Sequence, residues 1–461
     1  MISTLPIDCL NQIFECLEED KVTLHSCLLV NRLLCRISVE ILWRNIREFE
    51  KIRTLIACLP NESKDFLLNN GVTSIPISKP PLFNYASFCK VLSIRYLLIE
   101  DNEIEILSDN PKNYLITKEI LKMFMRQISS LEKMDFSFME YYYYYYGCYD
   151  DFYKNYNFLN FINFPGAKDC LKNLSELKCY SFMNSEFFLQ LSKICHNINY
   201  LVIIFEETAS VGIKDLILIL SQNNLESISF SRYNSCNESN FDDIFNYFTL
   251  TKHSNTLTKL FLSGISPPSI FTKIIFSNFR ILLLYFYPVN IDDILTKFLV
   301  NNGKNLEELV LLSDSVNSVI KNSINLAIAK YCPKLKSLYT EFKGIEELIM
   351  IFDNCQQLES IRNSCHNSLG GKKLLEIVAK YSPKNFHKLN LHHAKLNSKD
   401  LESFFISWKD RVSKRPFSFI FDGDGIVINN KIKKLIRKYK ALDVINKFEE
   451  DENPEQYINR S

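Results

Sequence analysis

The chain has 461 residues, a formal net charge of +1, an apolar content of 47% and 14 cysteines. This length predicts two or three domains or one long repeat array, and the near-zero net charge provides no field that would attract nucleic acid. The first residues lack the basic start and apolar centre of a signal peptide, and no apolar run is long enough for a membrane helix. We therefore expect a cytoplasmic or nuclear protein with no nucleic acid and no membrane among its partners.

The cysteines indicate a reducing compartment. None are spaced C-x-x-C, and most lie within apolar patterns, as Cys27 and Cys195 do. Small buried thiols are typical of intracellular proteins, whereas secreted proteins pair their cysteines in disulfides.

Residues 5–45 carry three short amphipathic patterns. The first follows Pro6, which is tolerated in the first turn of a helix, and Thr23 is expected to cap the second helix. A third pattern closes at Trp43. The first helical face consists of Leu10, Ile13, Phe14 and Leu17. Because three helices of this length bury too little surface to be stable alone, we expect them to dock on another structure.

This segment resembles an F-box. The string L-P-x-[DE]-x-L-x-x-I-F-x-x-L is followed by L-x-x-C-x-x-V-[NC]-R and a final L-W. The matched residues are Leu5, Pro6, Asp8, Leu10, Ile13, Phe14, Leu17, Leu24, Cys27, Val30, Asn31, Arg32, Leu42 and Trp43. The resemblance implies a module over 1–47 that docks on the Skp-type adaptor of cullin (SCF) ubiquitin ligases. The residue patterns alone also fit a helical cap at the start of a larger fold.

One position departs from the F-box pattern. Many F-boxes have a tryptophan two residues after the arginine, where this chain has Leu34. Because leucine keeps the position apolar, we expect docking to be retained. The three helices display more apolar residues than they can bury among themselves. We expect the adaptor surface to be formed or supported by Leu5, Pro6, Leu10, Ile13, Leu28, Val30 and Trp43.

Residues 48–130 are predicted to be a helical linker with one or more degenerate first repeats. Ser63 is expected to cap a short helix within it. The predicted elements are helices over 49–59 and 64–68, a strand over 91–98 and a helix over 118–128.

A phrase of the form L-x-x-L-x-L then recurs. Its first positions are Leu174, Ile198, Leu225, Leu257, Phe279, Leu306, Leu335, Leu358 and Phe386. Eight intervals span 386 − 174 = 212 residues, and the mean of about 26–27 falls in the leucine-rich-repeat range. Leu131 begins an earlier, degenerate unit. Apolar residues at positions 1, 4 and 6 place a strand and the turn before it in one core, and helical periodicity follows each strand.

The repeats contain a second regularity in their cysteines. Cys195, Cys332 and Cys355 each lie three residues before a first position, which resembles the cysteine-containing leucine-rich repeats found behind F-boxes. We expect an α/β fold with a leucine-rich-repeat solenoid over 131–430, its parallel sheet concave and its helices convex. A doubly wound sheet is the alternative, because strands and helices also alternate there.

Two segments flank or interrupt the repeats. An insertion over 137–165 contains the run Tyr141–Tyr146, which is either a low-complexity surface loop or an aromatic recognition loop. Residues 431–461 are predicted to be a capping helix with a disordered tail. The lysine-rich face of that helix is also compatible with a membrane surface.

The implied function is that of a substrate receptor in an SCF-type ligase, with partners Skp and cullin, an unknown target protein and no catalysis or cofactor of its own. Motifs for nucleotide binding, serine hydrolysis and zinc proteolysis are absent from the sequence. The alternatives are a repeat scaffold without ligase association and an enzyme with a cysteine nucleophile. The thiol and imidazole candidates for such an enzyme, or for a zinc site, are Cys365, His366, His387, His392 and His393.

The target surface is predicted from position 5 of each repeat. This position lies between two buried positions, so alternation turns it onto the concave face. From repeat to repeat it is Lys178, Val202, Ser229, Phe261, Leu283, Val310, Tyr339, Arg362 and Asn390. We expect an exposed apolar stripe from Phe261 to Tyr339, flanked by Tyr285, that binds the target. We expect Lys178 and Arg362 to select acidic features. The alternative is that another segment folds over the stripe and buries it.

Overall fold

The computed structural model describes residues 5–46, 50–72, 75, 81–94, 97, 113–136, 156–181, 183, 185–205, 219, 224–232, 252–265, 267, 269–286, 291–313, 322–342, 344–364, 370–411, 415–421, 426 and 428–450. The chain divides into two compact units. The first comprises Met1–Ile204 and Ala209–Asn224, and the second comprises Phe205–Thr208 and Leu225–Ser461.

The first unit begins with helices and continues with strands that alternate with helices. Its helices are α1 (Ile7–Glu15), α2 (Lys21–Cys27), α3 (Arg32–Leu42), α4 (Glu50–Cys58), α5 (Asn61–Asn69), η1 (Tyr85–Phe88), α7 (Asn113–Gln127), η2 (Tyr156–Asn163), α10 (Ala167–Leu171) and α11 (Ser185–Ile194). Its strands are β1 (Asn45–Ile46), β2 (Val91–Ser93), β3 (Lys133–Asp135), β4 (Glu176–Tyr180) and β5 (Tyr200–Phe205).

The second unit alternates strands and helices throughout. Its strands are β6 (Ser227–Arg232), β7 (Lys259–Ser263), β8 (Ile281–Phe286), β9 (Glu308–Ser313), β10 (Ser337–Tyr339), β11 (Ser360–Ser364), β12 (Lys388–His392), β13 (Phe417–Phe421) and β14 (Ile445–Glu450). Its helices are η4 (Ser269–Thr272), α14 (Asp292–Asn302), η5 (Gly303–Asn305), α15 (Asn322–Tyr331), α16 (Ile345–Asn354), α17 (Gly371–Tyr381), α18 (Ser398–Lys409) and α19 (Asn430–Ala441).

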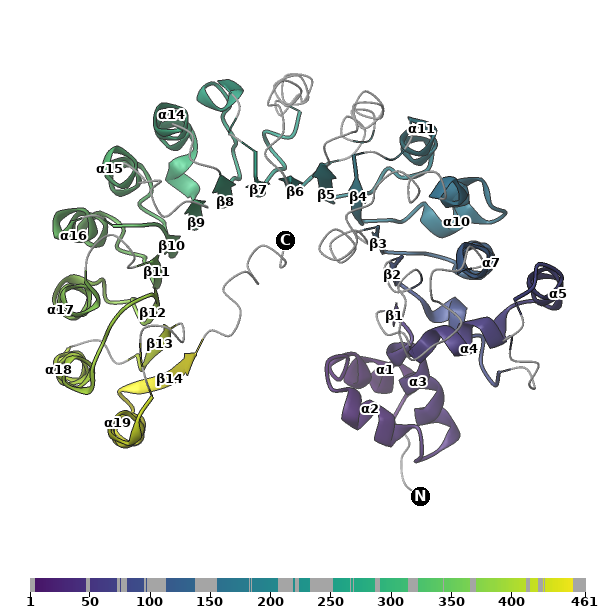
Figure 1. The fold of residues 1–461 in the computed structure, drawn as a ribbon, viewed down its shortest axis with the longest axis horizontal. Coiled ribbons are helices and arrows are strands. Elements are labelled where there is room, and N and C mark those ends of the chain that lie inside the picture. Colours follow the sequence, from purple (N-terminus) through teal and green to yellow (C-terminus); the bar gives the residue numbers. More distant parts are fainter. Residues whose placement is uncertain are drawn as a thin grey trace. The chain divides into compact units, whose positions relative to one another are not determined.

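Within each unit every strand pairs in parallel with the strands next to it in sequence. In the second unit the strands follow an arc, and α14 to α19 all lie on its outer side (Figure 1). This arrangement confirms the α/β solenoid with a parallel sheet on the concave face and excludes a doubly wound sheet, which has helices on both faces.

The predicted repeat register is also confirmed. Position 4 of one repeat is opposite position 4 of the next, as in Leu260–Leu282, Leu282–Leu309 and Leu309–Leu338. All nine predicted first positions, from Leu174 to Phe386, are fully buried. The core of each unit is therefore the layer between the strands and their helices.

A recurring hydrogen-bond pair links consecutive repeats at the start of β2 to β5 and of β7 to β12. The Arg280 carbonyl accepts from the N–H groups of Glu307 at 2.7 Å and Glu308 at 3.0 Å, and the Glu307 carbonyl accepts from the N–H groups of Lys336 and Ser337 in the same way. We call this series the carbonyl ladder. It begins at the Arg44 carbonyl, which accepts from the N–H groups of Lys90 and Val91. The repeat geometry therefore starts directly after α3.

The repeat cysteines occupy the residue after a helix. The N–H groups of Cys195, Cys332 and Cys355 close the last turns of α11, α15 and α16 by bonding to the carbonyls of Leu191, Ile328 and Ile351. All three thiols are buried, and the Cys195 thiol donates to the Leu171 carbonyl of the preceding repeat at 3.3 Å. A small side chain with a weak donor suits this tight junction between repeats.

Several predicted boundaries need correction. The strand predicted over 91–98 ends at Ser93, and the two helices predicted over 64–68 and 118–128 start earlier, at Asn61 and Asn113. Ser63 is not a cap, because its hydroxyl donates to Glu119 at 2.7 Å. Residues 445–450 form β14, so the predicted disordered tail, which begins at Glu449, loses its first two residues. The tyrosine run and most of its insertion, 137–155, lie outside the described residues.

Candidate docking surfaces

The three N-terminal helices are set by two side-chain caps. Asp20 accepts from the Thr23 N–H at 3.0 Å and from the Thr23 hydroxyl at 2.7 Å, so Asp20, and not Thr23, is the N-cap of α2. A carboxylate three residues before a helical N–H is well placed to accept from it. Asn31 caps α3 through the Leu34 N–H at 2.9 Å. The Asn31 of the motif therefore has a local structural role.

These helices share one small core. Phe14, Leu24, Ile37 and Ile41 are buried at its centre. Leu34, at the position where many F-boxes have tryptophan, packs against this cluster together with Leu10, Leu17, Cys27 and Leu42. The Leu34 side chain therefore contributes to the core of the three helices.

Many apolar side chains of the helices are left outside this core. Leu29 is 90% exposed and Val22 is 79% exposed, although both are aliphatic. We call the following set the N-terminal apolar face: Leu5, Ile7, Ile13, Val22, Leu29 and Val30. Burying a side chain of this kind contributes about 1.5–3 kcal/mol, so these residues favour contact with a partner.

The predicted adaptor residues fall into two groups. Leu5, Pro6, Ile13 and Val30 are exposed, whereas Leu10, Leu28 and Trp43 are half-buried. Leu10 packs into the helical core, and the Trp43 ring lies 4.3 Å from the Tyr85 ring, between their centroids. The sequence pattern missed Ile7, Val22 and Leu29, because they lie off the periodic stripes that identified the helices.

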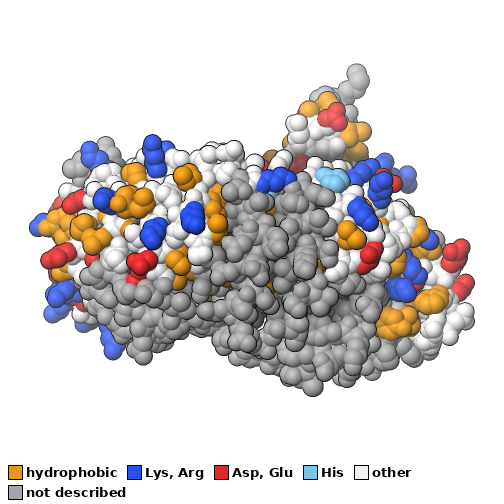
Figure 2. Space-filling view, turned by 90° about the horizontal axis from the view of Figure 1, so that it is seen from above, with side chains coloured by type: hydrophobic (Ala, Val, Ile, Leu, Met, Phe, Trp, Pro, Cys, Tyr) orange, Lys and Arg blue, Asp and Glu red, His pale blue; other side chains and the backbone are white. Residues whose placement is uncertain are grey.

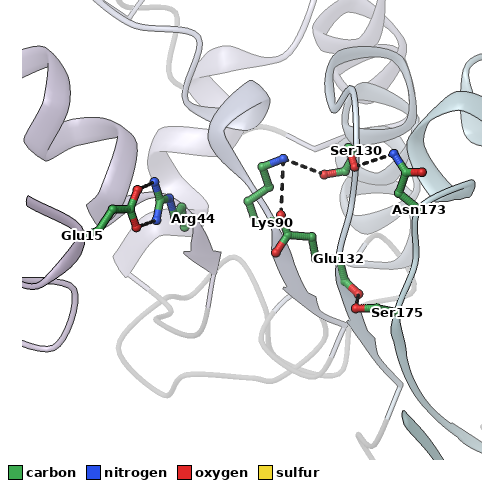
Figure 3. A network of polar contacts seen from close by, with 7 residues as sticks. All are labelled: Glu15, Arg44, Lys90, Ser130, Glu132, Asn173 and Ser175. Atoms are coloured by element: carbon green, nitrogen blue, oxygen red, sulfur yellow. Dashed lines mark hydrogen bonds and ion pairs between the residues drawn. The ribbon is translucent and has the colours of Figure 1, made fainter. Parts of the chain in front are cut away.

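One contact ties the helices to the start of the repeats, and another links the starts of β2 and β3 (Figure 3). The two terminal guanidinium nitrogens of Arg44, Nη1 and Nη2, donate to the Glu15 carboxylate, which joins α1 to the residue that starts the carbonyl ladder. Farther along, the Lys90 ammonium donates to the Ser130 carbonyl at 3.1 Å and lies 3.6 Å from the Glu132 carboxylate. The hydrogen bond from Arg44 lowers the pKa of Glu15, and burial of the carboxyl opposes this effect.

The predicted concave stripe exists as a cluster, but it is not exposed. Phe261, Leu283 and Val310 lie opposite one another on β7, β8 and β9, and they are only 4%, 7% and 5% exposed. Side chains from positions 3 and 7 of neighbouring strands, Ile281 and Leu312, pack against them. The expectation of an open stripe was wrong in this respect. We call the set Phe261, Ile281, Leu283, Val310, Leu312 and Tyr339 the concave apolar cluster.

The remaining predicted target residues lie at three places. Tyr285 is half-buried on β8, beside Leu312 of β9, and Lys178 lies on β4 of the first unit. Arg362 follows Tyr339 in the position-5 row of the second unit. The structure therefore groups Arg362 and Tyr285 with the stripe residues in one unit.

Arg362 is part of a polar cluster at one end of that row. Its Nε donates to His392 Nε2 at 2.8 Å, and its guanidinium carbon lies 4.9 Å from the centroid of the Tyr339 ring. The stacking on Tyr339 holds the guanidinium plane in one orientation. Sequence reasoning missed the contribution of His392 to this cluster, because it lies two residues beyond the position-5 row.

The candidates for cysteine or metal chemistry have no matching geometry in the described parts of the chain. Burial raises the pKa of Cys195 and of Cys355 to about 12, so both thiols are protonated at neutral pH. Within the described residues no group of three or more His, Cys, Asp and Glu side chains is arranged to hold a metal ion. Cys365 and His366 lie outside the described residues. None of the described helices is both long and apolar enough to cross a membrane.

Comparisons with known proteins give matches only to solved structures, at low identity and low TM-score. No family model and no curated protein matches the sequence. A chain from the crystal structure of the Rad7 and Elc1 complex in yeast has 14% identity and a TM-score of 0.44, over 95% of this chain and 91% of that chain. The leucine-rich repeat-containing protein LegL7 from Legionella pneumophila has 15% identity and a TM-score of 0.37, over 68% of this chain and 91% of its own.

Proposed function

We propose that this protein is the substrate-recognition subunit of an SCF-type ubiquitin ligase. In this proposal the N-terminal helices dock a Skp-type adaptor, which connects to the cullin, and the repeats bind the target protein. The protein itself contributes binding and no catalysis. The F-box pattern of residues 5–43 and the exposed N-terminal apolar face support the adaptor part of the proposal.

The N-terminal apolar face is the observation that carries the proposal. A soluble chain rarely keeps several aliphatic side chains exposed within one small helical unit unless a partner covers them. A standard interface buries about 800 Å² on each partner, and its centre needs a few well-packed apolar anchors. Leu29 and Val30, at the connection between α2 and α3, are the most exposed adjacent pair of this face.

The target part of the proposal rests on the second unit. In the position-5 row, Arg362 follows directly after Tyr339 of the concave apolar cluster. This arrangement suits a partner that offers an apolar side chain next to an acidic one. Because the three central side chains are almost covered, we assign first contact to the half-buried residues Tyr339 and Tyr285.

Adaptor binding is tested by co-purification of the full chain from cells. Wild-type protein is expected to bring down Skp and cullin, and Leu5→Ala with Pro6→Ala is expected to lose both. Val300→Ala is the matched control, because Val300 is an aliphatic residue of the second unit that is also half exposed. If the wild-type isolate contains no Skp and no cullin, the ligase assignment is wrong and the protein is a repeat scaffold.

Target binding is tested by proximity labelling. Tyr285→Ala with Tyr339→Ala is expected to retain the adaptor and to lose a set of labelled proteins. Phe261→Asp with Tyr339→Ala is a harsher variant, and its circular dichroism must match the wild type before its labelling is interpreted. An unchanged list of labelled proteins for both variants would contradict this target surface.

The alternative of a cysteine nucleophile finds no support in the buried repeat thiols. A nucleophilic cysteine needs a depressed pKa and access to solvent. Burial raises the pKa of the Cys332 thiol, and that of Cys195 in the same way. Leu34, the one departure from the F-box pattern, packs against the helical core and is not part of the N-terminal apolar face, so it gives no reason to prefer a scaffold without ligase association.

A further inference from the structure

The last outer helix of the second unit differs from the others in charge. α14 and α16 begin with acidic residues, Asp292 and Asp293 in the first case and Glu346 and Glu347 in the second. α19 has no acidic residue in its first turn, and neither have α15 and α17, but α19 has more cationic residues than either of them. It has six cationic residues, all exposed: Lys431, Lys433, Lys434, Arg437, Lys438 and Lys440. We call these six side chains the basic face.

The basic face is electrostatically unfavourable for an isolated helix. Lys433 and Arg437 are four residues apart, as are Lys434 and Lys438, and like charges at this spacing repel each other. Cations in the first turn also oppose the positive end of the helix dipole. Among the described residues only Lys438 of this face has a carboxylate partner, Glu402 at 3.6 Å. Within the part of the chain that the structure describes, most of the positive charge of this helix is therefore not neutralised by a carboxylate.

We propose that the basic face binds the phosphate backbone of a nucleic-acid duplex without regard to base sequence. α19 has 12 residues, so it is about 18 Å long. One strand of a duplex places about five phosphates along that length. Lysine contacts phosphate as a point charge and requires no fixed orientation, which suits backbone contacts. This proposal is independent of the adaptor-binding role.

Two other classes of partner fit the helix less well. An interfacial membrane helix inserts its apolar face into the lipid, but Ile432, Leu435 and Tyr439 of α19 are buried in the protein. The centre of a protein–protein interface is depleted in lysine and enriched in apolar residues, and the basic face is the reverse. On the face shown in Figure 2, by contrast, described acidic, basic and apolar side chains are interspersed. The net charge of the whole chain is only +1, so it does not reveal the concentration of positive charge on α19.

The test measures binding of the full chain to a fluorescent 20-base-pair DNA duplex of arbitrary sequence as the salt concentration is varied. We expect log K to fall with log salt with a slope of about −4. Lys433→Gln, Lys434→Gln and Arg437→Gln together are expected to weaken binding at least tenfold. They are also expected to reduce the slope by about one for each charge removed. Glutamine is a good helix former, and circular dichroism checks that α19 is retained.

Matched controls separate the basic face from net charge. Lys297→Gln, Lys304→Gln and Lys330→Gln remove the same charge from exposed sites on earlier outer elements, and are expected to change binding less than twofold. Lys433→Arg with Lys434→Arg keeps the charge and is expected to bind as the wild type does.

Three results would overturn the proposal. The first is equal losses in the two charge-removing variants. The second is no duplex binding by the wild type at low salt. The third is preferential binding to phosphatidylserine vesicles or polyglutamate. The measurement with vesicles is needed because Ile428 and Leu442, at the two ends of α19, are exposed apolar residues that a lipid surface could contact.

Discussion

The N-terminal apolar face and the concave apolar cluster are both apolar, but they differ in how far neighbouring residues cover them. Val22 on α2 is 79% exposed in the first, whereas Phe261 is 4% exposed in the second. Short helices direct side chains outward around their axes, so an apolar residue off the packed stripe has no neighbour to cover it. Parallel strands lie about 4.8 Å apart, so side chains of positions 3, 5 and 7 cover one another. Apolar character alone therefore does not identify a docking surface.

The largest expected effect comes from the core of the second unit, between its strands and its outer helices. Phe298 on α14 is fully buried, with its ring centroid 5.1 Å from that of Phe271 and 5.5 Å from that of Phe279. Phe298→Ala should lower the free energy of unfolding by about 3–5 kcal/mol, measured by urea unfolding. Val300→Ala on the same helix, at a half-exposed site, should cost less than about 0.5 kcal/mol. Equal costs for the two variants would contradict this packing.

The next prediction compares one substitution in the concave apolar cluster with one in the N-terminal apolar face. Phe261→Ala should destabilise the protein by about 1.5–3 kcal/mol, because its side chain is covered by neighbours in the concave apolar cluster. Leu29→Ala should change stability by less than about 0.5 kcal/mol, because its side chain is already in solvent. Thermal unfolding followed by circular dichroism measures both variants. A small shift for Phe261→Ala would mean that the cluster is open in solution and that the original expectation of an exposed stripe was right.

A third prediction concerns a buried polar side chain. Asn302, at the end of α14, accepts from the Phe276 N–H at 2.7 Å and donates to the Ile274 carbonyl at 2.9 Å. Asn302→Ala leaves both backbone groups buried without this partner, which should cost about 1–3 kcal/mol. Asn301→Ala, whose side chain makes one described bond, to the Thr272 carbonyl, is the control and should cost less. Hydrogen exchange at Phe276 should also speed up in Asn302→Ala only.

The smallest expected effect lies in the contact between α1 and the start of the repeats. The Arg44 guanidinium holds the pKa of Glu15 below its usual value of 4.5. Because the folded pKa is the lower one, this contribution is complete above that usual value and is lost as the pH falls through the folded pKa. Glu15→Gln should therefore cost about 0.2–1 kcal/mol at pH 7 and nothing in strong acid. Trp43 fluorescence in a Trp408→Phe background measures it, and a cost that persists in acid would rule out the ion pair as its source.

The repeat register could be predicted from sequence because it depends only on local spacing. Positions 1, 4 and 6 must be buried together, and nine first positions from Leu174 to Phe386 meet that requirement. The strand β14 could not be predicted in this way. A register shift between Phe417 and Ser418 accompanies its pairing with β13, and its buried residues Ile445 and Phe448 are three apart. The alternation that identifies strands is therefore missing there.

The candidate surfaces were predictable in position but not in exposure. The position-5 row placed Phe261, Leu283 and Val310 side by side as expected. Their coverage depends on Ile281 and Leu312, which belong to other positions of neighbouring repeats. In the N-terminal segment, by contrast, an exposed apolar residue was not predicted. Leu29 carries no periodic signal, and only the packing of the three helices shows that it is left outside.

The carbonyl ladder limits how a chain of this kind can change its length during evolution. The intervals between first positions vary, from 279 − 257 = 22 residues to 257 − 225 = 32 residues. The same paired bonds nevertheless reach the Glu226 and Thr258 carbonyls in those two repeats. Insertions between a strand and the next ladder position are therefore tolerated. One residue gained or lost inside a strand would turn its following side chains to the opposite face. New length is accordingly expected as whole repeats or as longer connections after the strands.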